Sequence, residues 1–467
     1  MTNRNKYMFT GKHLGLFAVL LGIFFSSCEK YVDIDKAPNL LETSDVFITD
    51  NTATGAVLGI YSYYPAAPSL QYFTTAGAME SGEMEYQYAS STAEINQFQQ
   101  SVVSPTNSLM TQNMWQYPYA FIRQCNLAVE GITAATTLTD SVKSRLLGEA
   151  KFLRAYMYFH LVNYFGAVPL VLSSDALTTA SQPRDSVGKV YAQIIADLKS
   201  AEELVPAAYP TGTTLRTRVN KYTAAALLAR VYLYRGDYVN AEAEASKVIS
   251  ASEITYGLPA PANAFVNTSN EIILQFGTTY GYSFYGTNYR TTATSGIPNY
   301  YLTSNAANVF ESGDARRTNW MDSVISGATT YYRVNKFKLA TASAGNEYNV
   351  VLRLGEQYLI RAEARAKQDK IDGAQSDLNA VRSRAGLGST PAATQADLVT
   401  AVAKERQAEL FGEIAHRWFD LKRTNKADEV LKVLKASTWK STAVLLPIPY
   451  VERQNNTALS QNDGYVE

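Results

Sequence analysis

Apolar side chains recur at helical spacing over much of the chain. In residues 186–206 (SVGKVYAQIIADLKSAEELVP) the apolar positions fall three and four apart, which places them on one stripe of a helix. Asp185 or Ser186 is suited to cap this helix, and Pro206 ends it. The same period, with many aromatic rings, runs through residues 148–166. The pattern therefore predicts a mainly α-helical protein.

Two segments have the helix–turn–helix spacing typical of tetratricopeptide repeats. They are residues 221–249 and residues 355–386, and the second departs from the first at Arg365, where the first has Tyr232. Small residues twelve apart in each segment would let two antiparallel helices approach closely. These residues are Ala229 and Ala241 in the first segment, and Ala362 and Ala374 in the second.

A different composition separates the two repeats. Residues 255–349 are rich in Gly, Thr, Ser, Asn and Tyr and lack helical stripes, although 271–276 (EIILQF) is a β-prone run. A second irregular, aromatic stretch covers about 61–100. Loop-rich segments of this length are usually functional. We therefore expect a loop-rich binding subdomain at about 61–100 and 255–349, and helical repeats at about 105–250 and 350–430.

The N-terminus has the pattern of an export signal. A basic stretch precedes the apolar run Leu14–Phe25, which is too short to span a membrane, since spanning takes roughly 20 apolar residues. Ser26 and Ser27 then precede Cys28. Small residues before a cysteine predict a lipoprotein signal peptide over 1–27, with Cys28 lipidated and residues 28–467 forming the mature chain. An ordinary signal peptide, with Cys28 incidental, is the alternative.

Composition narrows the function classes. The chain has 42 basic and 42 acidic residues, so it has no basic surplus to neutralise phosphates, which argues against nucleic-acid binding. It has 32 tyrosines and only three histidines. Tyrosine offers a flat apolar face and a hydroxyl group, a combination that suits stacking on sugars or on partner surfaces.

Five ordered segments resemble the SusD/RagB family of nutrient-uptake lipoproteins from the outer membrane of Bacteroidota. The segments are 148–171, 216–249, 351–387, 404–426 and 445–465. The resemblance implies a SusD-like, mainly α fold, in which about four tetratricopeptide-type hairpins pack against an irregular subdomain with short β elements.

The resemblance also implies a role. Members of the family sit on the cell surface, bind a glycan and form the lid of a SusC-like TonB-dependent outer-membrane transporter, and Cys28 would be the lipid anchor. Two alternatives remain open: a structural partner of the transporter without glycan affinity, and a binder of peptides or other nutrients.

No catalytic constellation is evident in the sequence. His160 and His416 lie inside helical motifs, and neither zinc-ligand spacing nor a phosphate-binding glycine loop occurs. We therefore expect no enzyme activity, no metal and no cofactor. A glycosidase, which needs only two carboxylates, is the least favoured alternative, with Glu80, Glu83 and Glu85 as its best candidates.

Glycan binding needs flat rings for stacking and a few polar groups for sugar hydroxyls. The two irregular stretches supply the candidates, with Trp320 as the best single residue because it follows a loop among polar residues. Trp115 and Trp418 lie in helical motifs and are expected in the core. The other candidates are Phe73, Glu83, Tyr86, Tyr88, Tyr280, Tyr282, Tyr285, Tyr289 and Arg290.

Arginines inside the helical motifs are expected to be structural. Arg154, Arg230, Arg361, Arg382 and Arg417 lie near acidic residues, which favours buried or half-buried ion pairs. One such network is expected to contain Glu405, Glu409, Arg417 and Asp420. Asp314, Arg316 and Arg317 are expected to support the loop-rich subdomain.

Overall fold

The computed structural model describes residues 46–66, 69–88, 94–210, 215–278, 282–290, 296–339 and 347–466. The chain divides into two units, 1–45 and 46–467, and every described residue belongs to the second. The expected signal peptide, Cys28 and Tyr280 lie outside the described residues. In the described part of the chain, no helix is long and apolar enough to cross a membrane.

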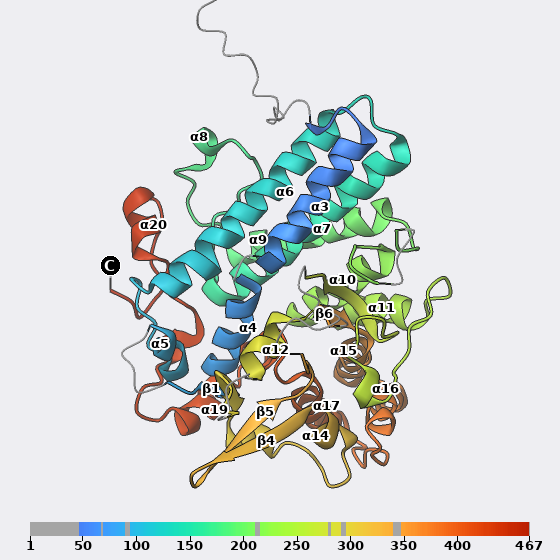
Figure 1. The fold of residues 1–467 in the computed structure, drawn as a ribbon, viewed down its shortest axis with the longest axis vertical. Helices are drawn as coiled ribbons and strands as arrows, with labels where there is room; N and C mark the ends of the chain where they lie inside the picture. The colour runs from blue at the N-terminus through green and yellow to red at the C-terminus, as the bar shows by residue number, and fades with distance from the viewer. Residues whose placement is uncertain are drawn as a thin grey trace, which may run out of the picture. The chain divides into compact units, whose positions relative to one another are not determined.

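Long helices form the first part of the fold, as Figure 1 shows. The central helix α7 packs against α6 and α9, and α3 lies against α6 and α7. A π-helical turn, Met110–Gln116, leads directly into α6. The four helices are α3 (Asp50–Ala66), α6 (Tyr117–Ala134), α7 (Asp140–Phe165) and α9 (Val187–Leu204).

The repeat helices continue this stack. Helix α10 packs on α9 and α11, and α11 packs on α15, although about a hundred residues separate α11 from α15 along the chain. Ser186 caps α9, and both predicted hairpins are confirmed. Their helices are α10 (Lys221–Tyr234), α11 (Tyr238–Ile249), α15 (Leu354–Lys367) and α16 (Ile371–Arg384), with α17 (Gln395–Leu410) packed on α15 and α16.

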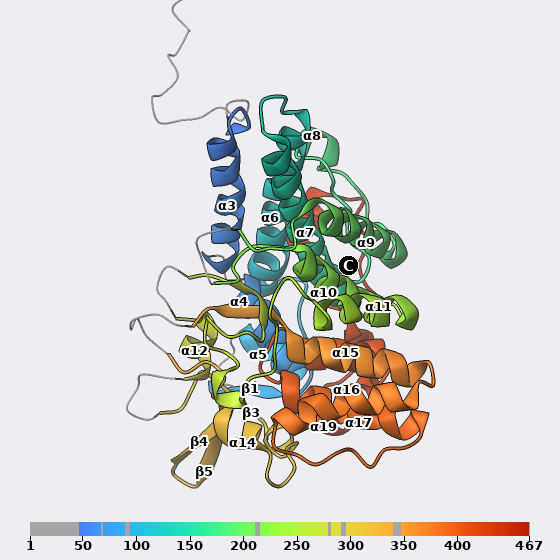
Figure 2. The same cartoon turned by 90° about the vertical axis from the view of Figure 1, so that its right-hand side faces the viewer.

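Short strands, five of them in the insert between α11 and α15 and one, β1, after α4, form two small sheets in the described chain. A four-stranded antiparallel sheet has the order β1-β3-β5-β4, and a separate pair joins β2 to β6. In Figure 2 the β4–β5 hairpin lies at the lower left, and α15 to α17 lie to its right. The strands are β1 (Met84–Tyr86), β2 (Ile272–Phe276), β3 (Tyr300–Leu302), β4 (Met321–Ser326), β5 (Thr329–Val334) and β6 (Asn349–Arg353).

The first stretch expected to be irregular is largely helical, so the boundary at residue 61 is wrong. Residues 61–66 complete α3, and α4 (Ser69–Glu80) follows. Helix α4 is buried on nearly every side, so it carries no alternation of apolar and polar faces that a periodicity search could detect. Irregular backbone begins only after Glu80, where a turn leads into β1.

Short helices complete the described chain. Helix α18 contacts α4, and α19 follows α18 directly. The remaining elements are α5 (Ile95–Gln100), α8 (Ala176–Thr179), α12 (Phe284–Tyr289), α13 (Ser304–Ala307), α14 (Ala315–Asn319), α18 (His416–Arg423), α19 (Ala427–Leu434), α20 (Tyr450–Asn455) and the 3-10 turns Pro261–Asn263 and Ser441–Val444.

A buried ion network holds the insert to α17. Arg353 Nη1 lies 2.6 Å from Glu271 and 2.5 Å from Glu409, while its Nε lies 2.8 Å from Glu413. Arg316 joins the same group through Glu405 and Glu409, and Asp314 caps α14 while pairing with Arg316. The structural role expected of Asp314 and Arg316 is thereby confirmed.

Four of the five helix-motif arginines form the expected ion pairs. Arg154 pairs with Asp197 at 2.7 Å and Arg230 with Glu356 at 2.6 Å, both inside the core. Arg361 and Arg382 are also paired; their partners are Asp377 for the first, and Glu311 and Glu405 for the second. Within the described ranges Arg417 forms no such pair, and Asp420 pairs instead with Arg406 and Arg423, so the network expected around Arg417 and Asp420 is not found there.

Candidate functional site

The position of Trp320 contradicts its expected role in ligand stacking. Its side chain is only 1% exposed, and its indole N–H donates to the carbonyl of Pro261 at 2.7 Å. Lys336 Nζ lies 4.7 Å from the ring centroid, and the guanidinium carbon of Arg384 lies 4.8 Å from it. Cations and core residues therefore cover the ring faces that a sugar would need. Trp320 anchors the insert to the ion network.

Three further candidates are core residues rather than ligand contacts. The Phe73 ring stacks on His160 at 4.9 Å and on Tyr164 at 5.4 Å between centroids. Tyr285 is buried with its hydroxyl 3.0 Å from that of Thr74. The buried Tyr289 donates to the carbonyl of Gly412. Helix α12 thus faces inward, because its aromatic residues complete the core against α4 and the segment after α17.

Two of the predicted tyrosines do reach the surface. Tyr86 ends strand β1 and is half-buried, and Tyr88 follows it with 56% of its side chain exposed. Their rings meet edge to face at 5.6 Å, and Tyr86 also contacts the ring of Tyr300 at 5.2 Å. This arrangement holds Tyr86 in place and leaves a large part of Tyr88 accessible to a ligand.

Pairing of the strands creates a second tyrosine pair that sequence reasoning missed. Tyr301 on β3 lies opposite Glu85 on β1, and its hydroxyl donates to Glu85 Oε2 at 2.9 Å. The ring of Tyr331 on β5 meets Tyr301 edge to face at 4.9 Å. The only sequence signal was the pair of short Tyr-rich runs YYL and TTYYRV, which become neighbours only when the sheet forms. Because successive strand residues point to opposite faces of a sheet, Tyr301 and its partner Glu85 lie on one face, and Tyr86 and its partner Tyr300 lie on the other. We call the four tyrosines of the two pairs, Tyr86, Tyr88, Tyr301 and Tyr331, the tyrosine surface, which thus has one pair on each face of the sheet.

Charged groups lie beside the second pair. Arg333 on β5 binds Asp322 on β4 through two hydrogen bonds of 2.7 and 2.9 Å. The predicted residue Arg290 also binds Asp322, at 3.2 Å, and bonds to Asn335. Arg290 is therefore held near the tyrosine surface by a shared carboxylate. Tyr282 is half-buried, and its carbonyl accepts a hydrogen bond from Thr278.

This arrangement suits reversible binding of a neutral, hydroxylated ligand. Half-exposed rings offer apolar faces for sugar stacking, and rings held by edge-to-face contacts lose little freedom on binding. Glu85, Arg333 and Arg290 supply acceptors and donors for hydroxyl groups. Because each hydroxyl bond replaces a bond to water, the affinity should be modest.

The three carboxylates suggested for glycosidase chemistry point to different places. Glu80 is buried and accepts from the Ser101 hydroxyl at 2.5 Å; burial raises its pKa to about 7, against the lowering effect of Lys435. Glu83 accepts from the Gly412 N–H at 3.0 Å, while Glu85 binds Tyr301. The three carboxylates thus have separate partners, and no two of them line the same described cavity.

Other reactive side chains are buried. Burial lowers the pKa of His160 to about 3, and burial also lowers the pKa of His416, so both rings are neutral in the core. Cys125 lies inside α6, where burial raises the pKa of its thiol. Within the described ranges, no three His, Cys, Asp or Glu side chains are arranged to hold a metal ion. Trp115 and Trp418 are buried, as predicted.

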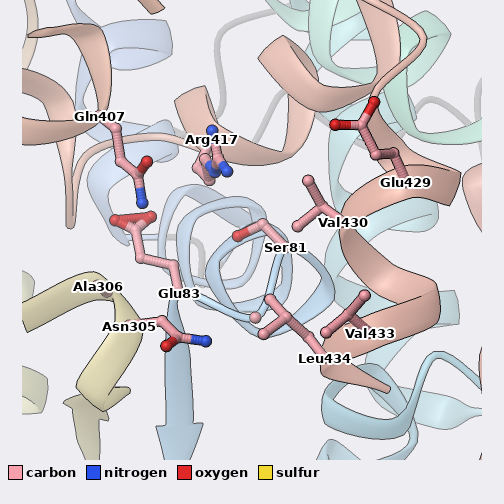
Figure 3. A pocket seen from close by; sticks show the side chains of 11 residues that line it. Ser81, Glu83, Asn305, Ala306, Gln407, Arg417, Glu429, Val430, Val433 and Leu434 are labelled. Atoms are coloured by element: carbon pink, nitrogen blue, oxygen red, sulfur yellow. The ribbon is translucent and has the colours of Figure 1, made fainter. Parts of the chain in front are cut away.

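A cavity of about 270 Å³ lies beside the start of β1, and Figure 3 shows its lining. Glu83, Gln407 and Arg417 line one part of it, and apolar side chains of α19 line another. A neighbouring cavity of about 560 Å³ shares Gly82, Asn305 and Leu434 with the first and extends to Glu85. The two hollows therefore connect the Arg417 region to the strand that carries part of the tyrosine surface.

Sequence comparisons define the class of protein. A family described as "Starch-binding associating with outer membrane" matches residues 59–233, and the SusD family matches residues 273–465. The chain belongs to the SusD/RagB family, whose members bind carbohydrates and associate with the outer membrane.

Particular relatives agree with this assignment. A SusD-like protein of Formosa agariphila, P2, is 28% identical over 76% of this chain and 81% of its own length. A solved structure titled a laminarin-binding SusD-like protein is 26% identical, with a TM-score of 0.75 over 90% of this chain and 100% of its own. Surface glycan-binding protein A from Bacteroides uniformis, at 20% identity, has the same fold, with a TM-score of 0.75 over 88% and 99% of the two chains.

Proposed function

We propose that the protein captures a glycan at the cell surface through the tyrosine surface. The observation that supports this most directly is the two pairs of accessible rings on one small sheet, with Glu85 and Arg333 beside the Tyr301–Tyr331 pair. The laminarin-binding protein of similar structure makes a neutral β-glucan the first ligand to test. The separate partners of Glu80, Glu83 and Glu85 support binding without cleavage.

The same proposal includes an anchor and a transporter. Cys28 would carry the lipid that holds the protein at the outer membrane, and the helical repeats would contact a SusC-like TonB-dependent transporter as its lid. Stacked helical hairpins present extended surfaces suited to protein binding, and α10, α11, α15 and α16 form such a stack. Glycan capture by the tyrosine surface and docking by the repeats would then use different parts of the chain.

Affinity gel electrophoresis of the chain from residue 29 onward tests the glycan proposal. Retardation is expected in a gel containing laminarin or another neutral polysaccharide, and Tyr88→Ala or Tyr331→Ala should weaken it several-fold. Tyr450→Ala is the matched control, because Tyr450 is 45% exposed on α20, away from the tyrosine surface. Retardation that survives both substitutions would place the glycan elsewhere, and no retardation by any polysaccharide would contradict glycan capture.

Co-purification tests the partner. The full-length chain should be isolated from outer membranes together with a TonB-dependent transporter, and Cys28→Ala should release the chain from the membrane. A Cys28→Ala protein that remains in the membrane fraction in the absence of the transporter would contradict the lipid anchor.

A further inference from the structure

The cavity beside β1 contains a cation, Arg417, that has no ion-pair partner among the described residues. Arg417 projects from α18 into the space between Glu83, Gln407 and the side chains of α19, as Figure 3 shows. It is half-buried, and it forms no hydrogen bond or ion pair with any described residue. Asp420 and Glu83 act on it only through space. A guanidinium group stays charged, so a half-buried one is stabilised by any anion that reaches it.

Other arginines nearby show how the chain treats buried guanidinium groups. Arg423 lies on the same helix and pairs with Glu363 at 2.6 Å and with Asp420 at 2.7 Å. Arg406 on α17 also pairs with Asp420, at 2.8 Å. Asp420 is therefore occupied by two arginines, and Arg417 faces the cavity instead.

Acidic residues of the cavity do not neutralise Arg417. Burial raises the pKa of Glu83 to about 7, against the lowering effects of the Gly412 N–H, Lys336 and Arg417, while Glu413 adds to the increase. Glu83 is therefore largely uncharged in mildly acidic solution. Glu429 lies at the rim and pairs with Lys426 at 2.5 Å. The charge left over inside the cavity is thus positive.

The remaining lining is partly polar and partly apolar. Gln407 and Asn305 carry amide groups for which the structure gives no partner in the described chain, so they are available to ligand hydroxyls. Val430 and Leu434 line the α19 side. The volume of about 270 Å³ is close to the lower end of ordinary ligand pockets, roughly 300 Å³, and so suits a ligand of about one sugar unit.

We propose that this cavity binds the carboxylate of a small hydroxylated acid, a sugar acid, with Arg417 holding the carboxylate and the amides of Gln407 and Asn305 holding hydroxyls. A guanidinium group matches a carboxylate through two parallel hydrogen bonds, whereas a neutral sugar offers no such partner. The acid is either a free monosaccharide or the acidic end unit of a glycan. The neighbouring cavity, which extends to Glu85, gives a glycan chain a route toward the tyrosine surface.

Calorimetric titration of the mature chain at pH 6 with glucuronate, glucose and isovalerate tests this site. Glucuronate should bind, glucose should give no heat, and isovalerate, a carboxylate without hydroxyls, should bind at least tenfold more weakly. No binding of glucuronate would overturn the proposal. Equal binding of glucose would show that charge is not recognised, and equal binding of isovalerate would show that hydroxyls are not; either result would also overturn it.

Two variants locate the site. Arg417→Gln should weaken glucuronate binding at least tenfold, whereas Arg123→Gln, an exposed arginine on α6, should not change it. Asn305→Asp adds a negative charge at an exposed lining position and should weaken binding even if Arg417→Gln fails to fold. Glucuronate binding that is unchanged in Asn305→Asp and in folded Arg417→Gln would contradict the assignment.

The pH dependence and the ligand source provide two further tests. Raising the pH from 6 to 8 ionises Glu83 and should weaken glucuronate binding several-fold. Glu83→Gln should abolish this pH dependence. A pH dependence that persists in Glu83→Gln would contradict the part assigned to Glu83. If an oligoglucuronate binds more tightly than glucuronate, and Tyr331→Ala removes this difference, the ligand is the acidic end of a glycan. If the oligoglucuronate binds equally or more weakly than glucuronate, the ligand is the free acid. Both results support the carboxylate site. Failure of neutral glycan binding leaves this proposal intact, because glucuronate binding should not change in Tyr88→Ala.

Discussion

Aromatic residues of one insert have two opposite environments. Trp320 and Tyr289 are buried against the ion network and the core, whereas Tyr301 and Tyr331 are half-exposed on the small sheet. Only strand β4 and a turn separate Trp320 from Tyr331 along the chain. Position in a loop-rich region is therefore a poor guide to exposure. The environment of each ring depends on strand alternation and on cations brought from other elements.

The largest loss of stability is expected in the buried ion network that holds the interior aromatic residues. Arg353→Met removes the partner of Glu271, Glu409 and Glu413 and leaves buried charge uncompensated. The free energy of unfolding should fall by about 5 kcal/mol, which chemical denaturation would measure. Lys426→Met breaks an exposed pair and should cost less than about 1 kcal/mol. Equal losses in the two variants would contradict a stabilising network.

Substitution of Trp320 tests whether the buried aromatic residues stabilise the fold. Trp320→Ala should lower the free energy of unfolding by about 4 kcal/mol, because it opens a cavity and removes the bond to Pro261. Trp320→Phe keeps most of the volume and should lose less. A variant that melts like the unsubstituted protein but no longer binds glycan would restore Trp320 as a ligand contact.

Glu83 lies between the interior and the surface, and its titration should be visible in stability. Because the folded-state pKa is raised from 4.5 to about 7, the folded chain binds more protons than the unfolded chain between these values. Stability should therefore decrease as the pH rises from 4.5 to 7, by at most about 3 kcal/mol, and then level off. Melting curves of the unsubstituted chain and of Glu83→Gln across this range would isolate the effect. Parallel curves would contradict the raised pKa.

The smallest effects are expected on the tyrosine surface. Tyr301→Ala should weaken glycan binding about fivefold, roughly 1 kcal/mol, with little change in unfolding free energy. Tyr301→Phe keeps the ring but loses the bond to Glu85, so it separates stacking from hydrogen bonding. Affinity electrophoresis and thermal melting measure the two quantities. A large loss of stability in Tyr301→Phe would show that Tyr301 is mainly a structural residue and not a ligand contact.

Local patterns were enough to predict much of the helical part. The hairpin of α10 and α11 follows from residues close in sequence: an apolar period, small residues at the helix contact, and a turn at Gly236. The second hairpin, α15 and α16, follows from the same spacing. Helix α4 escaped detection because burial on all sides removes the alternation of apolar and polar positions.

The candidate site depended on contacts between distant segments. Trp320 is enclosed by Lys336, Arg353 and Arg384, which come from three other segments. Tyr301 and Tyr331 meet only through the pairing of β3 and β5. Arg417 was expected in an ion pair, but its neighbours on α17 and α18 occupy the available carboxylate. Tyr86 and Tyr88 could be found from sequence because they lie in the irregular, aromatic part of 61–100 that does remain outside the helices.

The contact between α11 and α15 has a consequence for synthesis and for engineering. The two helices are direct neighbours although residues 250–353 lie between them, so closing this loop costs roughly 4 kcal/mol in chain entropy. A chain emerging from the ribosome keeps one face of α11 uncovered until α15 has been made. Once α11 and α15 are packed together, both ends of the insert lie at the same place in the helical stack. An insert from a related protein could therefore be exchanged as a unit if its ends and its acidic and basic anchors are kept.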